Sequence, residues 1–205
     1  DKRTSSDQYG YFAITNTNLV KSIGLVKVSS NGYYNAFKTF IPVAGKETFI
    51  RIPLQAKKLT GQIAASAGGK LVIEEKASLS LNESSVVNAS NNSAFDGQIQ
   101  VNATSFHNKP AGVLPGDGRG ANSEGYLKTL QFYGALAVNL SSDNGTALQI
   151  APGKTAFIQI PVTETLLSSA PSTIDLWYFN ESKGLWMQEG TATRNGNVYE
   201  ATVSH

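Results

Sequence analysis

The chain has 205 residues, of which 40% are hydrophobic and 16% charged, with two histidines and no cysteine. The low charge argues against a disordered polyelectrolyte, and the lack of cysteine excludes disulfide scaffolds, cysteine-ligated zinc and thiol catalysis. A formal net charge of +2 does not indicate a nucleic-acid partner. We expect neither a metal site nor a cofactor.

The polar surface is built mainly from neutral side chains. Ser, Thr and Asn together number 53, against 32 charged residues. This composition is typical of extracellular β-proteins, in which Thr favours strands and Asn and Ser favour turns. No apolar run is long enough to predict a membrane-spanning helix, and Asp1-Lys2-Arg3 does not start an export signal. We therefore expect an extracellular or cell-surface protein whose first residue lies downstream of a removed segment.

Short apolar runs between turn residues predict strands in the first quarter of the chain. The predicted strands lie at 9–14, 25–28, 34–43 and 48–54. Asn31-Gly32 is a strong hairpin signal, since both residues tolerate a positive φ. In the last of these runs, alternation places Ile50, Ile52 and Leu54 on the core face.

The pattern pauses around residues 55–58, which predicts a boundary between domains 1–56 and 57–205. Beyond it, strands are expected at 58–65, 70–73, 79–81, 98–106, 130–140, 146–150, 154–160, 174–180, 185–190 and 197–203. Residues 82–97 should form an exposed loop or a weak edge, and only 162–169 could be helical. The rhythm predicts an all-β protein of two consecutive β-sandwich domains, the first small and incomplete at its N-terminus.

No catalytic constellation stands out in the sequence. The run from Gly116 to Gly120 has the G-x-G spacing, but no phosphate-binding Lys-Ser/Thr follows it. We interpret it as a structural turn in which Asp117 bonds backbone amides and Arg119 pairs nearby. The chain also lacks the G-x-S-x-G elbow of hydrolases. The sequence therefore predicts a non-enzymatic protein.

Aromatic residues concentrate in one predicted hairpin near the C-terminus. Trp177 and Tyr178 lie on its first strand and Trp186 on its second. These rings could form a stacking platform for sugars, or they could close a hydrophobic core. Both interpretations stay open at this point.

Residues 4–54 resemble the latter part of a carboxypeptidase-regulatory-like domain, a small transthyretin-like β-sandwich. The resemblance rests on Asp7-Gln8-Tyr9-Gly10-Tyr11-Phe12, Val26-Lys27-Val28 and Ile50-Arg51-Ile52-Pro53-Leu54. The opening strand pair of that family is missing here, so the resemblance implies an incomplete sandwich with an exposed edge.

Residues 58–205 resemble the β-rich region that follows such domains in bacterial surface proteins and in cartilage intermediate layer protein. A more distant similarity is to ZU-five domains. The matching segments are Gly68-Gly69-Lys70-Leu71-Val72-Ile73, the turn at 115–120 and the aromatic hairpin with its Glu189-Gly190-Thr191-Ala192-Thr193 continuation. The resemblance implies scaffolding and surface attachment.

The end of the chain adds a speculative chemical role. In such proteins the stretch that matches Val203-Ser204-His205 usually continues with Phe-Ser, and some members with ZU-five domains cleave themselves there. The resemblance implies that His205 would be the base that assists a serine lying beyond it.

From these observations we expect a structural or adhesion module, a scaffold or stalk, that pairs with a protein partner or with itself through exposed strand edges. One alternative is a carbohydrate-binding module that uses Trp177, Tyr178 and Trp186. The other is a self-cleaving module in which the chain is cut just after His205.

Overall fold

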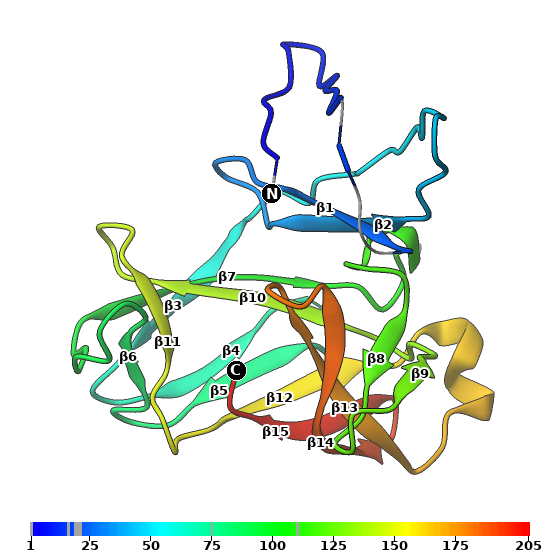
Figure 1. Ribbon diagram of the computed structural model, residues 1–205. Coiled ribbons are helices and arrows are strands. Elements are labelled where there is room, and N and C mark those ends of the chain that lie inside the picture. Colours follow the sequence, from blue (N-terminus) through cyan, green and yellow to red (C-terminus); the bar gives the residue numbers. More distant parts are fainter. Residues whose placement is uncertain (1, 16, 19–21, 75, 110) are drawn as a thin grey trace.

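The computed structural model describes residues 2–15, 17, 18, 22–74, 76–109 and 111–205. Two sheets form a sandwich (Figure 1). The five-stranded sheet has the order β3 (Leu59–Ala64), β7 (Gln98–Ser105), β10 (Leu136–Ser141), β11 (Ala147–Ile150) and β6 (Val86–Asn88). The all-β sandwich fold predicted from the sequence is confirmed.

The eight-stranded sheet combines strands from both halves of the chain. Its order is β4 (Gly69–Val72), β5 (Ser78–Leu81), β12 (Ala156–Pro161), β15 (Val198–Val203), β14 (Leu185–Asn195), β8 (Arg119–Ala121) and β9 (Leu127–Thr129). The strand β13 (Thr173–Asn180) pairs with the opposite side of β14. Only the β14–β8 pair is parallel among the strand pairs of the described residues.

The main core lies between these two sheets. Ile99 and Val101 of β7 are almost completely buried, and they pack in one cluster with Leu79 of β5, Ile158 of β12 and Leu176 of β13. Inward residues alternate with outward ones along β7, as a strand period of two requires. Both sheets therefore contribute to a single hydrophobic interior.

Before the sandwich, the described residues form one two-stranded sheet. The strands β1 (Gly24–Val28) and β2 (Ala36–Phe40) are antiparallel, with Lys27 opposite Phe37. The chain that leads from this sheet to the sandwich is held at Ala56, which forms an isolated antiparallel β-bridge with Tyr33. Nothing here divides the chain at residue 56, so the two-domain organisation stays a prediction.

The β1–β2 sheet is fastened to the hairpin of β13 and β14 by apolar and polar contacts. The rings of Phe37 and Phe179 lie 5.0 Å apart, and Phe37 is buried. Beside them, the Glu181 carboxylate accepts hydrogen bonds from Lys27 Nζ at 2.8 Å and from Asn35 Nδ2 at 2.9 Å. Because Lys27 and Glu181 are half exposed, we assign most of the docking energy to the phenylalanine pair.

Two predicted strands in the first quarter are wrong. In the first, the Asp7 carboxylate accepts the backbone N–H groups of Tyr9 and Tyr11, and the segment forms a turn. Residues 48–54 alternate between exposed and half-buried as expected, yet they form no strand. Alternation of side chains is not enough, since a strand also needs a neighbour for its hydrogen bonds.

Residues 82–97 contain the weak edge that the sequence allowed: β6 is a three-residue edge strand, in which Val86 and Val87 are buried. The strands β8 and β9 were not predicted. The stretch 162–169 contains a 3₁₀ helix, η2 (Glu164–Ser169), and a second one is η1 (Ala111–Val113). Within the described part of the chain, every helix is too short or too polar to cross a membrane.

The docking of the β1–β2 sheet can be tested with Phe37→Ala. Removing a buried phenyl group should lower the free energy of opening of the N-terminal segment by about 3 kcal/mol. Limited proteolysis within residues 41–54 should accelerate, while the circular dichroism of the sandwich is retained. Phe49→Ala is the matched control because Phe49 is 89% exposed. Equal proteolysis rates in the two variants would contradict the assignment.

Candidate functional site

A β-bulge in the middle of the β13–β14 pairing changes the setting of one carboxylate. Leu176 pairs with Gly190 and Trp177 with Gln188, so Glu189 is the extra residue on β14. A bulge breaks the strict alternation of side chains and often lies beside a functional site. The Glu189 side chain is only 9% exposed, although a carboxylate is normally at the surface.

The Glu189 carboxylate binds the residues that follow β15. Its Oε1 accepts the backbone N–H of Ser204 at 2.6 Å and the Ser204 hydroxyl at 3.0 Å. The register of β14 and β15, continued along both strands, would put Ser204 opposite Glu189. The carboxylate thus takes the place of a backbone carbonyl as the acceptor for this segment.

His205, two residues beyond β15, completes the cluster. Figure 1 marks this end of the chain with C. Its Nδ1 lies 3.0 Å from Glu189 Oε1, and its ring stacks on Tyr178 at a centroid distance of 4.1 Å and an interplanar angle of 8°. An imidazole that faces a carboxylate through one nitrogen keeps the other nitrogen for proton transfer. The His205 side chain is 52% exposed, so this second nitrogen can reach a group outside the cluster.

The sequence singled out His205 but missed Glu189. Glu189 stands among scattered carboxylates, and nothing in one sequence reveals a bulge or the register of β14 against β15. The structure brings Glu189, Ser204, His205 and Tyr178 together. Chemically, this set can hold an imidazole in a fixed orientation as a base.

The three aromatic residues proposed as a sugar platform do not share one surface. Trp186 is 8% exposed; its ring packs on Phe132 and Phe179, and its Nε1 donates to the Pro115 carbonyl at 3.1 Å. Tyr178 has His205 stacked on one face. A sugar needs an open ring face, and the buried Trp186 offers none. This hairpin closes a core, and glycan binding stays an untested prediction for Trp177 and Tyr178.

The turn at residues 115–120 brings Asp117 and Arg119 together. Arg119 Nε donates to both carboxylate oxygens of Asp117, at 3.0 and 2.9 Å, and the Arg119 backbone N–H adds a third bond. Burial alone would raise the pKa of Asp117, but the hydrogen bonds from Arg119 and Thr39 and the guanidinium charge together lower it. Because Thr39 lies on β2, this turn also joins the N-terminal sheet to the sandwich.

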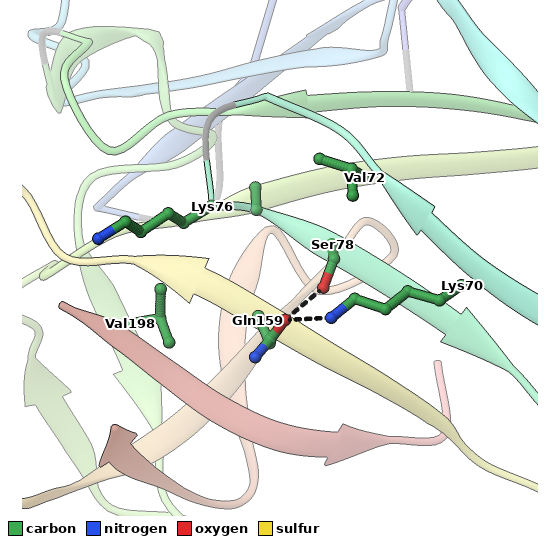
Figure 2. Close-up of a pocket in the computed structure, with 7 residues that line it drawn as sticks. Lys70, Val72, Lys76, Ser78, Gln159 and Val198 are labelled. Carbon is green, nitrogen blue, oxygen red and sulfur yellow. Dashed lines mark hydrogen bonds between the residues drawn. The ribbon is translucent and has the colours of Figure 1, made fainter. Parts of the chain in front are cut away.

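A hollow of about 260 Å³ lies over the outer side of β4, β5 and β12. Figure 2 shows Lys70 and Ser78 directed at the same atom, Gln159 Oε1, each at 2.8 Å. Gln159 in turn donates to Glu200 of β15 at 2.9 Å. These polar groups satisfy one another across the strands, so they reinforce the sheet and do not converge on a ligand.

The role of Glu189 can be tested with Glu189→Ala. Losing the acceptor should destabilise the segment after β15 by about 1 kcal/mol and speed hydrogen exchange of the Ser204 amide roughly five- to tenfold. Nuclear magnetic resonance would measure this rate. Glu124→Ala, at an exposed loop position, is the control. Unchanged exchange in Glu189→Ala would show that the carboxylate does not hold this segment.

The Asp117 contacts predict a pH dependence. A carboxyl whose pKa is lowered in the folded state stabilises the fold above its unfolded pKa, ordinarily 3.8, and this contribution is lost as the pH falls through the folded pKa. Asp117→Asn should therefore cost at most about 1 kcal/mol at neutral pH and nothing in strong acid. Urea unfolding at neutral and acidic pH measures the difference. A cost that is independent of pH would contradict the charge-based account.

Comparisons with protein-family models, with curated proteins and with solved structures found no match to this chain. The resemblances proposed from the sequence therefore stay predictions.

Proposed function

We propose that this chain is a non-enzymatic structural or adhesion module, a scaffold or stalk at the cell surface or outside the cell, that assembles through an exposed strand edge. The observation that supports the proposal most is the edge formed by β13. This eight-residue strand pairs with β14 along one side, and no strand of the described residues pairs with its other side. Unpaired backbone N–H and C=O groups along such an edge are a template for another strand.

The construction of the fold supports a mechanical role. The β13–β14 hairpin belongs to the sandwich, carries the N-terminal sheet through Phe179 and Glu181, and holds the end of β15 through Glu189. The N-terminal sheet and the segment after β15 are thus both held by one hairpin. A stalk or scaffold needs contacts of this kind, which hold its separate parts in fixed positions.

Edge assembly can be tested by changing the charge of β13. Thr173 and Asp175 are exposed on this strand, and lysines on an edge disfavour strand addition. Light scattering should show a mass that rises with concentration for the unmodified protein and a monomer for Thr173→Lys/Asp175→Lys. Thr202→Lys is the control, since Thr202 is exposed on the interior strand β15. A monomer at all concentrations for the unmodified protein would contradict the proposal.

A second candidate function, self-cleavage just after His205, is favoured by the contact between Glu189 and His205. In this proposal, a longer form of the chain carries a serine beyond His205. The second nitrogen of His205 takes the proton of that serine hydroxyl, whose oxygen attacks the preceding carbonyl carbon. The peptide C–N bond breaks, the freed amine takes the proton from His205, and an ester forms that water hydrolyses to an acid and the free hydroxyl.

The intact mass of the longer protein tests this second candidate. Two fragments are expected from the unmodified protein, an uncut chain from His205→Ala, and slower cutting in Glu189→Gln. Arg119→Ala, in the turn far along the chain from His205, is the control and should cut normally. A longer protein that stays uncut after purification would overturn this candidate and leave the scaffold proposal standing.

A further inference from the structure

Two loops on the N-terminal sheet expose a concentration of large apolar side chains. We call them the N-terminal loops, residues 2–15 and 41–54. Figure 1 shows both, in blue shades, projecting from the β1–β2 sheet on the side away from the sandwich. Their exposed apolar residues are Tyr9, Tyr11, Ile14, Ile41, Val43 and Phe49. Singly exposed apolar residues are ordinary, but six of them on two loops at the same side of the molecule suggest an interaction surface.

The same part of the chain is strongly basic. Residues 1–58 contain nine basic and three acidic residues, a net charge of +6, while residues 59–205 contain eight and twelve, a net charge of −4. The overall charge of +2 therefore hides a marked asymmetry between the two parts. The N-terminal loops themselves contain four basic and two acidic residues, a net charge of +2. In the second loop, Lys46 and Arg51 flank Phe49, and all three are exposed, as is Glu47 next to Lys46.

Exposed apolar side chains with basic residues beside them fit one kind of partner. Aromatic and aliphatic side chains gain free energy by entering the boundary between headgroups and acyl chains, and Lys and Arg are attracted to anionic headgroups. A soluble polyanion would use Lys46 and Arg51 but would leave Ile41 and Phe49 in water. The exposed apolar side chains of the loops therefore favour a lipid bilayer over an acidic polymer as the partner.

We propose that the N-terminal loops bind the surface of an anionic membrane, with Phe49 and Tyr11 entering the interface and Lys46 and Arg51 contacting the headgroups. The sandwich then stands away from the membrane, on the other side of the β1–β2 sheet. This binding goes beyond the scaffold function, and it does not require pairing through β13.

Sedimentation with vesicles tests the proposal. The unmodified protein should pellet with vesicles of equal parts phosphatidylcholine and phosphatidylglycerol, and less with phosphatidylcholine alone. Tyr11→Ser/Phe49→Ser should weaken binding about tenfold or more through the lost apolar burial. Lys46→Glu/Arg51→Glu should abolish the preference for anionic vesicles, and added salt should do the same to the unmodified protein.

Matched controls separate the loops from the rest of the surface. Tyr126→Ser/Leu127→Ser removes two exposed apolar side chains beside and on β9, within the sandwich, and should bind as the unmodified protein does. Circular dichroism would establish that each variant is folded. The proposal is overturned if the unmodified protein does not pellet with anionic vesicles, if the loop variants and the control bind alike, or if a soluble acidic polysaccharide is bound while vesicles are not.

Discussion

A line of four aromatic rings joins the parts of this molecule. Phe37 contacts Phe179 at 5.0 Å, Phe179 contacts Trp186 at 5.5 Å, and Trp186 contacts Phe132 at 5.0 Å. Aromatic side chains bury the largest areas of any residues, and tilted or edge-to-face pairs are favourable beyond that area. The line runs from the N-terminal sheet, through the β13–β14 hairpin, to the segment before β10. The N-terminal sheet has no other large buried side chain among its described residues, so its position depends on this contact.

The same hairpin also sets the position of the chain beyond β15. A bulge in the pairing of β13 with β14 turns Glu189 out of alternation, and its carboxylate accepts from Ser204 and approaches His205. In a regular hairpin Glu189 would have its own cross-strand partner on β13, whereas here it is the extra residue. The bulge therefore places Glu189 in the cluster of hydrogen-bonding groups that the described residues form around His205.

The turn at 115–120, the edge of β13 and the N-terminal loops each relate the fold to a proposed role. The Asp117–Arg119 turn contacts Thr39 of β2 and so adds a second link between the N-terminal sheet and the sandwich. Among the described strands only β14 pairs with β13, and the free side of β13 supports the proposal of assembly by strand addition. The N-terminal loops carry no strand partner, so their apolar residues stay exposed even where the sequence alternates like a strand.

The all-β class, most strands of the sandwich and the aromatic hairpin can be predicted from the sequence, because alternation and turn residues are local signals. The same is true of the contact between Asp117 and Arg119, which are two residues apart. That residues 9–14 and 48–54 form no strands is seen only in the folded chain, since pairing needs a distant neighbour. The same holds for Trp186, which is covered by Phe132 and Phe179, and for Glu189, which meets His205 through a bulge and a register that no single segment encodes.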